Sequence, residues 1–237
     1  MEGTETSVVQ TSSSMSQIPF MGPTRIRVND MLTSPANKHE LRTQETRKLL
    51  LEAAEKIFVR DGYEKAELGE IASEAGRTKG AIYAQFKSKE DVFLALVETQ
   101  ALRRRAKMQE LLAFSKDIRG NLAALRKYVL EFATQDSWGL LLLEYRLFVV
   151  RNPNAKKRLN KTYASFIAVD GERRYTELLG PAPKEKGAVS RTAAIHSMFA
   201  TLSALQLEAK FDPKALSTSE IGKIAANIFD ALLGTSK

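Results

Sequence analysis

Cationic and hydrogen-bonding side chains cluster in one short stretch of the N-terminal half. Residues 77–89 contain four Lys and Arg and no acid, whereas residues 61–74 contain five acids and one lysine. Donors of this kind bind the phosphate oxygens and base edges of nucleic acids. The residues that we expect to contact DNA are Arg77, Thr78, Lys79, Gly80, Tyr83, Gln85, Lys87 and Lys89.

Three of these residues have distinct tasks in such a contact. Gly80 has no side chain, so the backbone can approach a duplex closely at this point. Tyr83 can donate its hydroxyl to a phosphate, and Gln85 can form two hydrogen bonds with adenine. A helical bundle without a nucleic-acid role has no need for this combination beside clustered cations, so we favour the DNA-binding interpretation.

Two short helices joined by a tight turn are expected to position these residues. Apolar residues at spacings of three and four predict a first helix ending at Gly62, a second ending at Gly76 and a third beginning at Thr78. Such a pair, braced by another helix, forms a helix-turn-helix whose second helix enters the major groove. The residues expected to form the core of this head are Leu50, Ala54, Ile57, Phe58, Ile71, Ala72, Ile82 and Phe86.

Helical patterns continue beyond this head. Residues 88–91 resemble a capping box at the start of a long fourth helix. No alternating pattern of strand length competes, so the expected fold class is all-α. Further helices are predicted over residues 122–133, 138–151, 155–179, 188–210 and 219–233.

The chain is expected to have three parts. Residues 1–40, rich in Ser, Thr, Pro, Asn and Gln, are expected to be a disordered extension, with a DNA-contacting arm as the alternative. Residues 41–98 are the three-helix DNA-binding head, and residues 99–237 are a helical body for effector binding and dimerisation.

Composition excludes several classes of protein. The 237 residues include no cysteine, so disulfide scaffolds and thiolate metal sites are excluded. No apolar run approaches the ~18 residues of a membrane span, so we expect a cytoplasmic protein without a membrane partner. The net charge of +8 is misleading, because residues 38–98 hold 11 Lys and Arg against 12 Asp and Glu, while residues 99–237 hold 23 against 13.

The head resembles the DNA-binding domain of the tetracycline-repressor (TetR) family. The resemblance covers about 55 residues, and its elements are Arg47 through Phe58, Gly62-Tyr63, Glu70-Ile71-Ala72, Ala75-Gly76, Thr78-Lys79-Gly80, Ile82-Tyr83, Phe86 and Lys87 through Phe93. It implies a homodimer that binds an inverted-repeat operator in double-stranded DNA, usually as a repressor. It also implies an unidentified small-molecule effector that binds in the body and weakens DNA binding.

Two residues depart from the family pattern. Glu67 stands where a Thr or Ser hydroxyl usually holds a phosphate at the start of the second helix, and a carboxylate there repels a phosphate. Arg77 stands where a small apolar residue is usual in the family. Its side chain is expected either to contact DNA or to remain in solvent.

The body offers two candidate sites. Apolar faces on the last two helices are expected to pack against a second copy, although burial within the same chain is the alternative for Ile195, Leu202, Leu205, Ile221, Ile224, Ile228 and Leu232. Aromatic residues can line an apolar effector cavity with a few polar groups. The candidate lining residues are Phe132, Trp138, Tyr145, Phe148, Phe166, Asp170, Arg173, His196 and Phe199, with Glu144 and Arg146 as further polar candidates.

Two other functions compete with an effector-gated repressor. A ligand-independent DNA-binding regulator would have a fully packed body. A helical enzyme finds little support, because the two histidines, His39 and His196, lie in different segments and no metal-ligand spacing or Gly-rich phosphate loop is present. We therefore expect neither a cofactor nor a metal.

Overall fold

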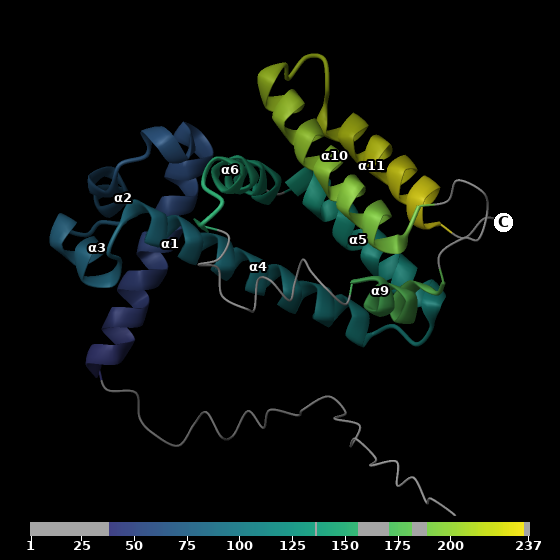
Figure 1. Ribbon diagram of the computed structural model, residues 1–237, viewed down its shortest axis with the longest axis horizontal. Coiled ribbons are helices and arrows are strands. Elements are labelled where there is room, and N and C mark those ends of the chain that lie inside the picture. Colours follow the sequence, from purple (N-terminus) through teal and green to yellow (C-terminus); the bar gives the residue numbers. More distant parts are fainter. Residues whose placement is uncertain (1–37, 136, 156–170, 182–188, 235–237) are drawn as a thin grey trace, which may run out of the picture. The chain divides into compact units, whose positions relative to one another are not determined.

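A computed structural model describes residues 38–135, 137–155, 171–181 and 189–234. All regular secondary structure in these ranges is α-helical, so the predicted fold class is confirmed. The helices, labelled in Figure 1, are α1 (Lys38–Lys65), α2 (Leu68–Glu74), α3 (Lys79–Gln85), α4 (Lys89–Ala113), α5 (Ile118–Gln135), α6 (Trp138–Arg151), α9 (Gly171–Leu179), α10 (Arg191–Phe211) and α11 (Thr218–Leu233).

The chain divides into two units, residues 1–41 and residues 42–237. The described part of the first unit is residues 38–41, which begin α1. The rest of the predicted disordered extension, and the first part of the helix predicted over residues 155–179, lie outside the described residues. The border expected near residue 98 stays a prediction, and we keep the names head for residues 41–98 and body for residues 99–234.

The head is held together by one apolar core. Its eight expected core residues are all buried, with at most 4% of each exposed. Helices α2 and α3 have seven residues each, which is too short for stability in water without tertiary contacts. Ile71 and Ala72 of α2 and Ile82 of α3 are buried in the same apolar cluster as the core residues of α1. Their burial holds the two short helices in place.

Two glycines set the bends of the head. Gly76 has a φ of 62° in the turn between α2 and α3, the left-handed conformation that a side chain disfavours. Gly62 has a φ of 76° and a ψ of 172°, which breaks the helical conformation of α1. The chain then makes a further turn to Lys65, so Gly62 is a kink within α1 where the sequence predicts the end of the helix.

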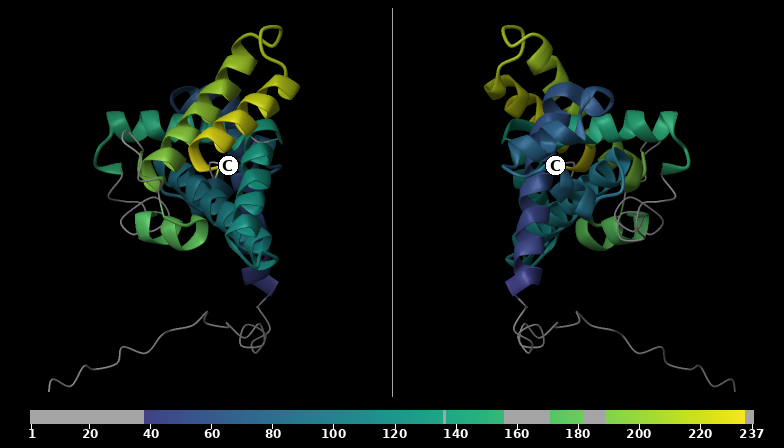
Figure 2. Two further views of the ribbon diagram at one scale, coloured as in Figure 1. Left: turned by 90° about the vertical axis from the view of Figure 1, so that its right-hand side faces the viewer. Right: turned by 90° about the vertical axis from the view of Figure 1, so that its left-hand side faces the viewer.

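The body is built on α5, α10 and α11, which lie side by side (Figures 1 and 2). Val129, Met198, Leu202, Ala225 and Leu233 are fully buried between them. None of the helices in the described ranges is long and apolar enough to cross a membrane.

A buried arginine joins three helix ends of the body. Arg191, at the start of α10, is only 4% exposed. Its guanidinium donates to the carbonyl oxygens of Leu179 at 3.5 Å, Pro181 at 3.3 Å and Leu233 at 3.5 Å. The carbonyls at the C-terminal ends of α9 and α11 lack partners within their own helices, so this cation satisfies groups that burial would otherwise leave unpaired.

Replacing Gly76 tests whether the left-handed turn is a backbone requirement. No atom lies within 4 Å of a Cβ built at this glycine, so Gly76→Ala adds no clash. We expect it to lower the free energy of unfolding by about 1–2 kcal/mol through backbone strain alone, measured by urea denaturation.

Gly69→Ala is the matched control, because Gly69 also has open space around it but lies in α2 without a positive φ. We expect this variant to be neutral or stabilised by up to about 1 kcal/mol through higher helix propensity. Equal stabilities of the two variants would contradict a strained turn.

Candidate nucleic-acid interface

Helix α3 has one buried and one exposed side. Ile82 is fully buried and Phe86, at its C-terminal end, is 4% exposed. Lys79, Gly80 and Tyr83 lie on the exposed side, where Tyr83 is 53% exposed. Three of the four predicted DNA-contacting residues of α3 therefore lie on its solvent-facing side.

The turn before α3 adds further donors to this surface. The Thr78 hydroxyl accepts a hydrogen bond from the Ala81 N–H at 3.2 Å and so caps the helix. Its hydroxyl hydrogen can still be donated to a ligand. Arg77 is exposed, and its guanidinium donates to the Gly76 carbonyl oxygen at 3.3 Å. This contact leaves other guanidinium N–H groups for an anion.

The remaining three predicted contacts differ in their surroundings. Lys87 is exposed and Gln85 is half-buried. The Lys89 ammonium instead donates to the Glu64 carbonyl oxygen at 2.8 Å and lies 4.8 Å from the centre of the Tyr63 ring. Lys89 thus binds within the head, where it joins the start of α4 to the end of α1.

The cap predicted at the start of α4 is present with one change of partner. The Ser88 hydroxyl accepts from the Asp91 N–H at 3.1 Å. The Asp91 carboxylate accepts from the N–H of Lys87, also at 3.1 Å, rather than from that of Ser88. By contrast, Glu67 precedes α2 without a side-chain capping bond, so the carboxylate at this departure from the family pattern does not cap the helix.

Arg47 is a residue for which the sequence predicts no role. Its guanidinium stacks over the Phe86 ring, 4.4 Å from the ring centre, and donates to the Gln85 carbonyl oxygen at 3.5 Å. It therefore holds the C-terminal end of α3 against α1. The signal in the sequence is its position, because Arg47 lies three and seven residues before the buried Leu50 and Ala54 and shares their helix face.

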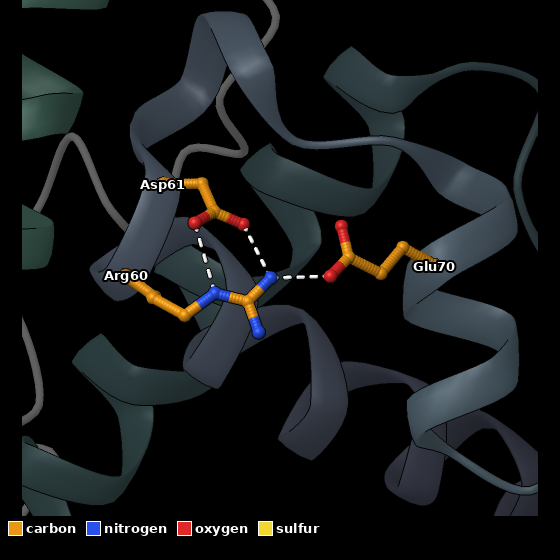
Figure 3. A network of polar contacts seen from close by, with 3 residues as sticks. All are labelled: Arg60, Asp61 and Glu70. Atoms are coloured by element: carbon orange, nitrogen blue, oxygen red, sulfur yellow. Dashed lines mark hydrogen bonds and ion pairs between the residues drawn. The ribbon is translucent and has the colours of Figure 1, made fainter.

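Ion pairs with α1 neutralise the acids of α2. Figure 3 shows the Arg60 guanidinium between two carboxylates: it donates to Asp61 at 2.8 and 2.6 Å and also to Glu70. The Lys56 ammonium donates to Glu74 at 2.8 Å. These hydrogen bonds lower the pKa values of Asp61 and Glu74, so both acids stay ionised but compensated.

The described aromatic residues of the predicted effector site have different packing partners. Phe132 and Phe199 pack edge to face with ring centres 4.9 Å apart in the body, and Tyr128 lies 6.2 Å from Phe199. Phe148 instead packs on Tyr63 and Phe93 of the head. The remaining aromatic candidates, Trp138 and Tyr145, are buried in α6.

The described polar candidates have partners or surroundings of their own. Arg173 is exposed and pairs with Glu177 at 3.1 Å, and His196 is exposed on α10. Glu144 accepts a hydrogen bond from the head. Phe166 and Asp170 lie outside the described residues. Burial raises the pKa of Tyr145 to about 12, so its hydroxyl stays protonated.

The predicted dimer residues divide into two groups. Ile195, Leu202 and Ile221 are at most 5% exposed and belong to the core of their own chain, which is the alternative that the sequence left open. The other four, Leu205, Ile224, Ile228 and Leu232, are partly buried. Within the described residues, no group of three or more His, Cys, Asp or Glu is arranged to hold a metal ion.

The head is similar in sequence to known regulatory proteins. Residues 50–96 match the family model described as bacterial regulatory proteins, tetR family. The transcriptional regulator AcrR of Shigella flexneri is 44% identical over 63 residues, which are 27% of this chain and 29% of AcrR. The transcriptional activator FasR of Mycolicibacterium smegmatis is 32% identical over 105 residues, 44% of this chain and 48% of FasR.

The likeness of the whole fold extends further than the sequence matches. The chain spans less than half the length of either AcrR or FasR. The structure of FadR from Bacillus subtilis in complex with stearoyl-CoA is 18% identical, with a TM-score of 0.58, and the similarity covers 80% of this chain and 99% of FadR. Residues 50–96 of the head thus match the tetR family of bacterial regulatory proteins, and the all-helical fold of the chain is similar to that of FadR.

Proposed function

We propose that the protein is a homodimeric, sequence-specific DNA-binding transcriptional regulator that acts in the cytoplasm. In this proposal it is a repressor that leaves an inverted-repeat operator when a small-molecule effector binds the body. The observation that carries the proposal is the exposed, acid-free surface of α3, which displays Lys79, Gly80 and Tyr83 while Ile82 and Phe86 hold the helix on the core.

The exposed donors of the head suit contact with a DNA duplex. Arg77, Thr78, Lys79 and Tyr83 offer donors at and beyond the N-terminus of α3, the end that meets base edges in a helix-turn-helix. Lys87 extends this surface past the end of the helix. Since Lys89 binds Glu64 and Tyr63, we assign it the task of fixing the start of α4 rather than a phosphate.

A regular stripe on α10 supports a homodimer. Its members recur at alternating spacings of four and three, the repeat of a helix that packs lengthwise on another, and all are exposed: Ala193, Ser197, Ala200, Ala204, Leu207 and Phe211. Leu207 is 54% and Phe211 is 82% exposed. We propose that this stripe, flanked by the partly buried Ile224, Ile228 and Leu232 of α11, packs against its copy.

Effector binding is proposed for the body. FadR, which shares the fold, was solved with stearoyl-CoA bound, which supports a body able to hold a small molecule. Similarity to these proteins does not distinguish repression from activation, because FasR is an activator. We propose repression, as the resemblance to the tetracycline repressor implies.

Selection of bound duplexes from a random DNA pool tests the proposed function. A palindrome with half-site centres about 34–36 Å apart is expected, because two heads related by a twofold axis read it together. A reporter promoter carrying that palindrome then distinguishes repression from activation. Screening small molecules for a raised melting temperature and for release of the palindrome identifies effectors. Failure to enrich any sequence would contradict the proposal.

Lys79→Ala tests the cationic surface of α3. We expect it to weaken operator binding by about tenfold or more and to reduce the salt dependence of binding, since each protomer loses a cation at the duplex. Lys116→Ala removes an exposed lysine from the connection between α4 and α5 and is the charge-matched control. Equal affinities of the two variants in fluorescence anisotropy would exclude Lys79 from the contact.

Gly80→Ala tests the close approach of the backbone to DNA. A Cβ at this position would lie 3.7 Å from the Thr78 hydroxyl oxygen, an ordinary contact, so the free protein accommodates it. We expect an unchanged or slightly raised melting temperature together with at least about tenfold weaker operator binding, because a methyl group at the groove displaces the helix. Unchanged affinity would mean that α3 does not approach the duplex at Gly80.

Leu207→Glu tests the dimer surface. A carboxylate buried between two copies is unfavourable without a partner, so we expect a monomer by analytical ultracentrifugation and loss of operator binding. Leu102, on α4, is 51% exposed, and Leu102→Glu is the control that should remain dimeric. A dimeric Leu207→Glu variant would place the interface elsewhere.

A further inference from the structure

The kink in α1 leaves a backbone N–H that a distant side chain satisfies. In an uninterrupted helix the Tyr63 N–H would donate to the carbonyl four residues earlier. The conformation of Gly62 prevents this, and the Tyr63 N–H donates to the Glu144 carboxylate of α6 at 3.1 Å instead. The partners are 81 residues apart in the sequence, so α6 of the body is bound directly to the head.

The Glu144 carboxylate lies close to Gly62. A Cβ built at Gly62 would lie 3.3 Å from one carboxylate oxygen of Glu144 and 3.6 Å from the other. A side chain at this position would therefore push the carboxylate away, in addition to the strain of a φ of 76°. Gly62 and Glu144 form a matched pair in which the glycine both exposes the N–H and makes room for its acceptor.

Two further contacts join α6 to the same part of the head. The hydroxyl of Ser137, which precedes α6, donates to Glu55 of α1 at 3.2 Å. One turn after Glu144, the Phe148 ring packs on Tyr63 and Phe93 with ring centres 4.5 and 5.5 Å apart. These contacts hold α6 to α1 and to the start of α4. In the hydrogen bond to Glu144, the donor is the backbone N–H of Tyr63.

We propose that Glu144 is a positioning residue for operator binding, which sets the orientation of the head on α6 without touching DNA. The inference rests on the proposed function, in which two heads must match the spacing of two half-sites. A charge-assisted hydrogen bond is directional and about twice as strong as a neutral one. Its loss leaves each head folded but less strictly oriented.

This role predicts an effect that depends on the number of heads engaged. A full operator requires both heads at a set separation, whereas a duplex with a single half-site engages one head in any orientation. Weakened orientation therefore lowers affinity for the full operator and spares the half-site. A residue that only supports folding of the head would affect both duplexes alike.

The test compares three variants on the operator recovered from the random pool and on its isolated half-site. Glu144→Ala removes the acceptor, and Glu144→Gln keeps an acceptor oxygen without the charge. Glu177→Ala removes an exposed acid of α9 that pairs with Arg173, so it matches the change in net charge. Fluorescence anisotropy gives the affinities, and thermal denaturation reports folding.

We expect Glu144→Ala to bind the full operator about tenfold more weakly, the size of effect that loss of a hydrogen bond to a charged group produces, with half-site affinity unchanged. Glu144→Gln should be intermediate and Glu177→Ala should match the wild type. Full-operator affinity of Glu144→Ala equal to that of Glu177→Ala would overturn the inference, as would an equal loss on both duplexes.

Hydrogen exchange of the Tyr63 amide provides a readout that needs no DNA. We expect slow exchange in the wild type and fast exchange in Glu144→Ala, with the amides in the middle of α5 unchanged. If the wild-type protein binds no duplex, the proposed function fails, and the exchange experiment then decides whether Glu144 holds the head. Equal exchange of the Tyr63 amide in both proteins would overturn the inference by itself.

Discussion

A helix of seven residues cannot maintain its conformation in water without contacts to the rest of the protein. This constraint applies to α3, and the structure meets it with the buried side chains of Ile82 and Phe86. Arg47 adds a cation stacked on the Phe86 ring. Because the buried side is fixed, the opposite side with Lys79 and Tyr83 is necessarily exposed, and the whole DNA-binding proposal depends on that division.

Local charge matters more than net charge for this surface. The head carries more acids than cations, yet the acids of α2 are paired with cations of α1. Lys56 and Arg60 compensate Glu74 and Glu70, the two acids within α2. Ion pairs between exposed groups add little stability, so their main effect here is on the potential that a phosphate meets.

Several features were predictable from the sequence because they arise from contacts between near neighbours. Helical periodicity placed the core of the head, and all eight expected residues are buried. Ser88 caps its helix as expected, since a hydroxyl at such a position reaches an N–H three residues later. Thr78, where the third helix was expected to begin, caps α3 in the same way. The spaced pattern around α2 and α3 was sufficient to indicate the tetR family, which the match to the family model supports.

The sequence by itself thus determined the helices, their caps and the resemblance of the head to the tetR family, because each depends on residues within a few turns of one another. Only the tertiary structure decided which partner each long-range polar group finds: Lys89 binds within the head, and Glu144 accepts from Tyr63. It also decided which face of α10 is free. This helix is apolar or small on most sides, so periodicity could not separate the buried Leu202 from the exposed Leu207. Docking on α5 and α11 made that choice.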